Sequence, residues 1–440
     1  MKRFCLILIA ALAICAGAAA QQVRDNVILR TDREDGIYAK GDTVRVLADV
    51  KAVPDKPLVF KVMRWAQWNE EFSRPVTLHE GENLLYERVF DESVQYVFEV
   101  TDNVNPRDFK DGCTGNAFAG AVVAPEGFKA GFSEPDDFLD FWNREIRKMR
   151  KMKMKVEVTK ESEKDGCEVR HVDINCVGPA PVRAYVAHPK DAKKGSLPII
   201  LNLHAAGSPG APSQAKTALF YANCVKGGAL AMDLNAHGML DDQPKEYYDE
   251  LSNGLLKGYS SREPAGLDDY YFKWMMLRAI RALDYLAKDP LWDRKHVIVS
   301  GTSQGGYQSA FLAVLDKRVS SAILTVPAGL DQGGSLQGRT NSWPNTMGKY
   351  RESSLKYLPY MDPAVWLYRT RADIWCEIGL FDFTCPAANL FAALNTVSSP
   401  VTIVTFQRPH GGHMDRSHKE VDRQRMEYFQ QAATKQGRHR

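Results

Sequence analysis

Apolar and polar residues alternate along the first part of the chain, between Val23 and about Pro125. The clearest alternating runs are Thr43–Val46, Leu58–Val62 and Val94–Val100, and polar or Gly/Pro-containing turns separate them. Alternation with a period of two is typical of strands that bury one face. Because no helical pattern interrupts these runs, the sequence predicts a small all-β sandwich of immunoglobulin type in this region.

The aromatic residues of this sandwich allow two interpretations. Trp65, Trp68 and Tyr96 are candidates for stacking on sugar rings. Aromatic residues in sandwiches more often belong to the core, so we expect a packing or spacer module and keep carbohydrate binding as the alternative.

A helical pattern follows the sandwich. Ser133 is expected to cap this helix, and Pro135 suits a first helical turn. The helix is expected to dock on the next domain through apolar residues at helical spacing, namely Phe138, Phe141, Trp142, Ile146 and Met149. Methionines interrupt the basic run from Lys148 to Lys155, so we interpret it as a solvated helix face.

From about Val156 onward, candidate strands alternate with candidate helices. The expected strands are 182–187, 199–203, 230–234, 297–300, 322–326, 374–378 and 401–406. The main expected helices are 271–287, 305–315, 386–395 and 417–435. This alternation predicts a largely parallel sheet with helices on both faces, in which active residues gather at the carboxyl ends of the strands.

The first twenty residues have the features of a cleaved export signal. Lys2-Arg3 provide a charged start, Leu6 to Ile14 is apolar, and Ala18-Ala19-Ala20 offers a small-residue cleavage site. The apolar segment is too short to span a membrane. We therefore expect a periplasmic or secreted protein with a signal peptide (1–20), a sandwich (21–127) and a second domain (128–440). Lipid attachment at Cys15 stays open.

Composition narrows the classes of partner. Hydrophobic residues make up 44% of the chain and charged residues 25%, as in ordinary globular proteins. The formal net charge is only +3, which argues against a nucleic-acid partner. The six cysteines outside the export signal show no zinc-type spacing, and both free thiols and disulfides stay open.

The stretch Gly301-Thr302-Ser303-Gln304-Gly305-Gly306 carries the strongest chemical signal. An apolar run, Val297–Val299, leads into it, and a helical pattern rich in small residues, Ser309–Leu315, follows. Strand, Gly-x-Ser-x-Gly and helix form the nucleophile elbow of an α/β-hydrolase fold, with Ser303 as the nucleophile. The sequence therefore predicts an α/β-hydrolase preceded by an immunoglobulin-like sandwich.

A serine nucleophile needs a base and an orienting carboxylate, in the chain order Ser, Asp, His. Asp382 lies just past the strand 374–378 and is the expected acid. The loop after 401–406 contains His410 and His413, and we expect His413 to be the base because two glycines let the loop bend back. The backbone N–H groups of Gln304 and Ala206 are the expected oxyanion donors.

A metal site is the alternative for the histidine loop. His410, His413, Asp415 and His418 offer nitrogen and oxygen ligands. Their spacing lies on a Gly-Gly loop rather than on one helix face, so we expect neither a metal nor a cofactor.

The chain resembles the acetylxylan esterase and cephalosporin-C deacetylase family over about residues 128–419. The resemblance rests on Ser303-Gln304-Gly305-Gly306, Asp268–Tyr271, Arg281–Leu286, and Gly379–Asp382 followed by Cys385-Pro386. It implies Ser303, Asp382 and His413 as the triad and Gln304 and Ala206 as oxyanion donors. The chain departs from the family's usual pattern at His204-Ala205-Ala206, at Ala236-His237-Gly238 and at His413-Met414, which puts the family's substrate range in doubt here.

These features together predict a serine esterase that removes acetyl groups from polysaccharides or oligosaccharides such as xylan. Trp343, Tyr350 and His410 are expected to contact the sugar. Two alternatives are a serine hydrolase of other specificity, such as a peptidase or a larger-acyl or glucuronoyl-type esterase, and an inactive sugar-binding relative. We also expect a segment that begins near Phe128 to fold and act without the sandwich.

Overall fold

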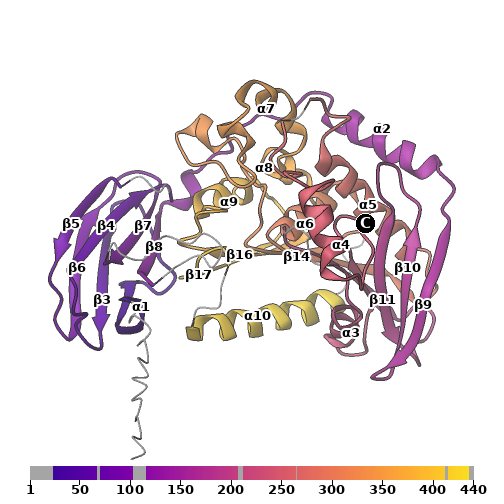
Figure 1. Cartoon of the computed structure of the whole chain (residues 1–440), viewed down its shortest axis with the longest axis horizontal. Coiled ribbons are helices and arrows are strands. Elements are labelled where there is room, and N and C mark those ends of the chain that lie inside the picture. Colours follow the sequence, from indigo (N-terminus) through magenta and orange to yellow (C-terminus); the bar gives the residue numbers. More distant parts are fainter. Residues whose placement is uncertain are drawn as a thin grey trace, which may run out of the picture.

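The computed structural model describes residues 23–66, 70–102, 115–206, 212–263, 265–411 and 415–435. Their strands form three sheets, of three, five and nine strands (Figure 1). The two smaller sheets lie in the N-terminal part, and the nine-stranded sheet with its helices forms the rest. The expected export signal, Trp68 and Cys113 lie outside the described residues.

The N-terminal sheets pack face to face after a short helix, α1 (Val23–Asn26). The three-stranded sheet has the order β1 (Val27–Thr31), β3 (Thr43–Val50), β6 (Gly81–Val89). The five-stranded sheet has the order β2 (Ile37–Tyr38), β8 (Ala117–Val123), β7 (Val94–Thr101), β4 (Leu58–Arg64), β5 (Phe72–Val76). Neighbouring strands are antiparallel except β2 and β8. The core contains Tyr96, so the packing interpretation of that ring is the better one.

The large sheet is parallel in its centre and at one edge. Its order is β17 (Val401–Phe406), β16 (Asp373–Gly379), β15 (Ser321–Thr325), β14 (Trp292–Thr302), β12 (Leu197–Leu203), β13 (Leu230–Leu234), β11 (Val182–Pro189), β10 (Cys167–Ile174), β9 (Val156–Lys164). The strands from β17 to β13 pair in parallel, and β11, β10 and β9 continue the sheet antiparallel.

Helices cover both faces of this sheet (Figure 1). One face packs against α10 (Asp415–Thr434) and α3 (Ala215–Asn223). The other faces α2 (Phe138–Lys151), α5 (Tyr271–Leu286), α6 (Gln304–Leu315), α8 (Pro363–Trp366) and α9 (Ala387–Leu394), while α4 (Lys245–Asn253) and α7 (Arg351–Tyr357) lie farther out. Short 3-10 helices occur at Pro125–Gly127, Gly334–Gln337, Thr346–Gly348, Leu358–Tyr360 and Leu367–Arg369.

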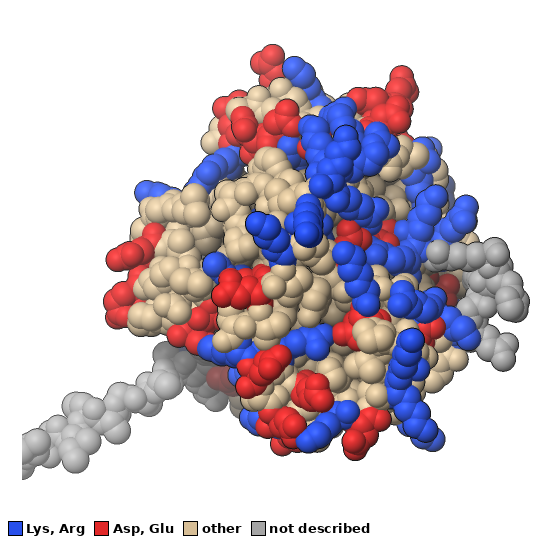
Figure 2. All heavy atoms as spheres, turned by 90° about the vertical axis from the view of Figure 1, so that its right-hand side faces the viewer, with Lys and Arg blue, Asp and Glu red and all other residues tan. Residues whose placement is uncertain are grey.

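The α2 helix corrects one local prediction and follows another. It begins at Phe138 and its N-cap is Asp137, so Ser133 is not the cap. The backbone N–H of Phe138 already donates to Pro135, which closes a turn before the helix starts. The five apolar residues expected on its inner face are buried. Basic side chains cover the exposed face of its C-terminal half, where Figure 2 shows lysine and arginine gathered. The helix ends at Lys151, so only the first half of the basic run Lys148 to Lys155 belongs to a helix face.

The described cysteines are free thiols: Cys167, Cys176, Cys224, Cys376 and Cys385. Within the described part of the chain, no helix combines the length and the apolar character that crossing a membrane requires.

Candidate active site

Ser303 lies in the sharp turn between β14 and α6 with strained backbone angles, φ 55° and ψ −115°. A non-glycine residue adopts a positive φ only where the surroundings impose it. Glycines on both sides make the turn possible. A Cβ on Gly301 would lie 2.3 Å from the Gly305 carbonyl carbon, and a Cβ on Gly305 would lie 2.0 Å from the Leu203 carbonyl oxygen. The geometry is that of a nucleophile elbow.

Two loops at the same sheet edge bring an acid and a base to Ser303. Asp382 follows β16 and His410 follows β17. The Nε2 atom of His410 lies 2.8 Å from Ser303 Oγ, and its Nδ1 atom lies 2.7 Å from Asp382 Oδ2. The other oxygen of Asp382 accepts hydrogen bonds from the backbone N–H groups of Thr384 at 2.8 Å and Cys385 at 2.7 Å. Ser303, His410 and Asp382 are thus linked in the order that a serine hydrolase requires.

The position of the base differs from the one that the sequence favoured. His410, expected to contact substrate, occupies the place between Asp382 and Ser303. His413 lies outside the described residues, as do the side chains of Asp415 and His418 that the metal alternative would use. We therefore assign the base role to His410. The sequence favours His413 because two glycines make its loop flexible. His410 lies nearer the end of β17, and its ring already reaches both Asp382 and Ser303 without that flexibility.

The electrostatic environment suits a proton acceptor. The Asp382 side chain has no exposed surface, whereas that of His410 is 22% exposed. Burial alone would lower the pKa of His410, but the Asp382 carboxylate, and after it Cys385, together outweigh burial and hold that pKa well above its ordinary value of 6.5. A protonated imidazole at position 410 is therefore stabilised beside Asp382.

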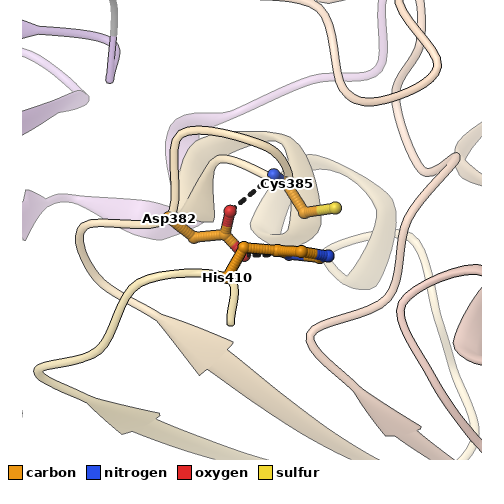
Figure 3. Close-up of side chains that lie close together, drawn as sticks. All are labelled: Asp382, Cys385 and His410. Carbon is orange, nitrogen blue, oxygen red and sulfur yellow. Dashed lines mark hydrogen bonds and ion pairs between the residues drawn. The ribbon is translucent and has the colours of Figure 1, made fainter. Parts of the chain in front are cut away.

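Cys385 lies against the same pair, as Figure 3 shows. Ligand atoms of Asp382, Cys385 and His410 all lie within 4.8 Å of one another, a set that a soft metal ion would accept. Both Asp382 oxygens and both His410 ring nitrogens are already engaged in the contacts given above, so a metal here would displace the triad. Burial raises the pKa of the Cys385 thiol, which keeps it protonated and a poor nucleophile.

The expected oxyanion donors lie at suitable places in the chain and remain predictions. Gln304 is the first residue of α6, where backbone N–H groups lack acceptors within the helix. Its side-chain carbonyl accepts a hydrogen bond from the Tyr259 hydroxyl at 2.7 Å. Ala206 is exposed and lies three residues beyond the end of β12. The preceding His204 places Nε2 2.8 Å from the buried Asp233, consistent with a structural role.

The two aromatic substrate candidates differ in their surroundings. The backbone N–H of Trp343 donates to the Thr384 carbonyl at 3.0 Å, so this residue borders the acid loop, and its indole packs edge-on against Phe272. Tyr350 is the N-cap residue of α7.

Two site contacts were not predicted from the sequence. Tyr259 supports the Gln304 side chain, and Cys385 lies against His410. The Cys385-Pro386 dipeptide beside Asp382 was the available signal for the Cys385 contact.

A protein family and a known esterase match part of this sequence. The model of the acetyl xylan esterase (AXE1) family matches residues 126–334. This range begins after the last strand of the sandwich and includes Ser303 but neither Asp382 nor His410. The chain is also 27% identical over 284 residues to the acetyl esterase Axe7A of Xylanibacter ruminicola. That alignment covers 63% of this chain and 63% of the relative, a little under two thirds of its length.

Solved structures give the same relationship for the fold. An acetyl xylan esterase from Paenibacillus sp. R4 superposes with a TM-score of 0.54 at 21% identity, covering 69% of this chain and 98% of that one. Acetyl xylan esterase 1 from Thermoanaerobacterium sp. JW/SL YS485 superposes with a TM-score of 0.52 at 22% identity, covering 69% of this chain and 96% of that one. Sequence and fold together relate this chain to the acetyl xylan esterase family, with which it shares the α/β-hydrolase fold.

Proposed function

We propose that the chain is an exported serine esterase that removes acetyl groups from polysaccharides or oligosaccharides such as xylan. One observation carries the reaction type: His410 lies within hydrogen-bond distance of both Ser303 Oγ and Asp382, with Ser303 on a strained elbow. This arrangement activates a hydroxyl for attack on a carbonyl carbon.

The reaction proceeds through an acyl-enzyme. Ser303 Oγ attacks the ester carbonyl while its proton passes to His410 Nε2. The carboxylate of Asp382 orients the ring and stabilises the imidazolium. The N–H groups of Gln304 and Ala206 hold the oxyanion, and His410 then gives the proton to the departing sugar hydroxyl. A water molecule, deprotonated by the same histidine, releases acetate and restores the serine.

The substrate class and the location are supported by other observations. The matching family and the curated relative are named for acetyl xylan and acetyl esters, which favours a small acyl group on a carbohydrate. The charged, apolar and small-residue segments within residues 1–20 favour export to the periplasm or beyond.

Acetate release from acetylated xylan and other acetylated glycans tests this proposal. We expect kcat/KM on soluble esters to fall steeply from acetyl to butyryl to octanoyl. Ser303→Ala should lower kcat on an aryl acetate by about a million-fold, as loss of a triad nucleophile does. A maximum at octanoyl, or turnover of peptides or glucuronoyl esters in place of acetates, would assign the scaffold to another hydrolase class. A chain that turns over no ester at all would favour an inactive sugar-binding relative.

A further inference from the structure

Two neighbouring interior strands of the five-stranded sheet, β7 and β8, have no solvent-exposed face. β7 and β8 are buried at every position, whereas β1, an edge strand of the three-stranded sheet, alternates between buried and more exposed residues. One face of β7 and β8 covers the sandwich core. The other faces the hydrolase beside β16, β17 and α9 (Figure 1). The loops after β16 and β17 carry Asp382 and His410.

Gln95 on β7 holds the acid loop at both of its ends. Its side chain lies in a fully buried residue, with Nε2 donating to the Leu380 carbonyl at 3.2 Å and Oε1 accepting from the Ala388 N–H at 2.9 Å. Leu380 and Ala388 lie on opposite sides of Asp382 in the chain. One amide from the sandwich therefore fixes where the acid loop leaves the sheet and where it enters α9.

Phe118 on β8 contacts both neighbours of Asp382. Its ring stacks on Phe381 with centroids 5.8 Å apart and meets Phe383 edge-on at 6.1 Å. Phe381 and Phe383 join a cluster whose other members, Met63, Ala66, Val97 and Phe118, all come from the sandwich. Anchoring these two rings in the sandwich leaves the intervening carboxylate directed at His410.

Gly120 on β8 holds the base loop. Its N–H donates to Gln407 Oε1 at 2.7 Å, and its carbonyl accepts from Gln407 Nε2 at 3.0 Å. Gln407 lies three residues before His410. A Cβ at position 120 would lie 2.3 Å from the Leu380 carbonyl oxygen, so only glycine permits this close approach of the acid loop.

We propose that the sandwich is a positioning element of the active site, in which Gln95, Phe118 and Gly120 keep the Asp382 and His410 loops in register with each other. The inference rests on the proposed function. Loops at a sheet edge are the most mobile part of such a fold, and a catalytic hydrogen-bond chain loses its effect when its members shift by a fraction of an ångström. The contacts of Gln95, Phe118 and Gly120 limit that shift.

Gln95→Leu in the full mature chain tests the proposal, with Asn83→Leu as the matched control. Asn83 is also a buried amide of the sandwich, but among the described residues its side chain bonds to Ala48, His79 and Gly81, all within the sandwich. At a temperature well below the unfolding midpoints, we expect Gln95→Leu to lower kcat on an aryl acetate at least tenfold with KM within twofold of wild type. The acid limb of its kcat/KM profile should move to lower pH, because Asp382 no longer holds the charge on His410. Asn83→Leu should keep kcat within twofold even where it lowers the unfolding midpoint.

A second pair covers the case in which Gln95→Leu does not fold. Phe118→Leu removes the ring that contacts the acid loop, and Phe98→Leu removes a fully buried ring that stacks on Phe60 inside the sandwich. The same contrast in kcat and pH profile is expected. Wild-type kcat in both interface variants, or equal losses in interface and control variants, would overturn the proposal.

Failure of the proposed function gives a different result. It appears as a wild type that does not turn over acetyl esters, whatever the interface variants do. The rate at which an organophosphate labels Ser303 then reports the triad without reference to the substrate, and the two matched pairs are compared by that rate.

Discussion

The anchoring of Gln407 fixes the position of His410. Gly120 bonds to the Gln407 amide, and His410, three residues later, lies within hydrogen-bond distance of Ser303 Oγ. His410→Ala is therefore expected to lower kcat about as much as Ser303→Ala, because members of a triad act as a unit. His413→Ala is the matched control and should stay within about tenfold of wild type. Steady-state turnover of an aryl acetate checks both variants, and the opposite ranking would return the base role to His413.

The pH dependence follows from the same residue. His410 accepts a proton only when neutral, and its pKa is held well above 6.5 by Asp382. We therefore expect kcat/KM to rise with pH through a midpoint above 6.5 and to be lost below it. Asp382→Asn removes the charge, so the remaining activity should show a midpoint at lower pH, with kcat down by about ten-thousand-fold. An unchanged midpoint in that variant would mean that another group titrates.

At the scale of single elements, the turn between β14 and α6 depends on close contact with β12. Gly305→Ala would place a Cβ 2.0 Å from the Leu203 carbonyl oxygen, a backbone atom that cannot move aside cheaply. We expect a loss of about 1–3 kcal/mol in unfolding free energy, as for other overpacked sites, and a large fall in kcat because Ser303 shifts.

Gly266→Ala is the control for this substitution, since nothing lies within 4 Å of the added Cβ there. It should change the unfolding free energy by less than about 0.5 kcal/mol. Denaturant unfolding and turnover measured on both variants decide the matter. Wild-type stability and kcat in Gly305→Ala would contradict the account of the elbow.

For the whole molecule, the interface changes what we expect of a shortened chain. A segment from residue 128 onward would expose Phe381 and Phe383 to water and leave the Leu380 carbonyl and the Ala388 N–H without Gln95. We expect it to be poorly soluble or to have at least tenfold lower kcat than the chain from residue 21, rather than to act independently as the period change suggests. Expression of both forms and turnover of an aryl acetate test this. A soluble short form with full kcat would support an independent module.

Periodicity and local spacing suffice for much of this protein. Period-two runs locate β3, β4 and β7, the alternation of strands and helices from 199 onward locates the parallel strands, and Gly301-Thr302-Ser303-Gln304-Gly305 identifies the elbow, because each depends on contacts between residues near in sequence. The position of Asp382 follows from the rule that parallel strands end at one edge.

Features that depend on contacts between distant segments of the chain are decided by the tertiary structure alone. Gln95 and Glu99 stand at positions that a strand pattern would assign to solvent, and both are buried because β7 packs on both of its faces. The sequence pattern could not decide between His410 and His413 either. That choice depends on where a loop anchored by the sandwich places the imidazole ring relative to Ser303, more than a hundred residues earlier in the chain. Local pattern determines which elements form; the packing of one domain on the other determines which side chains meet.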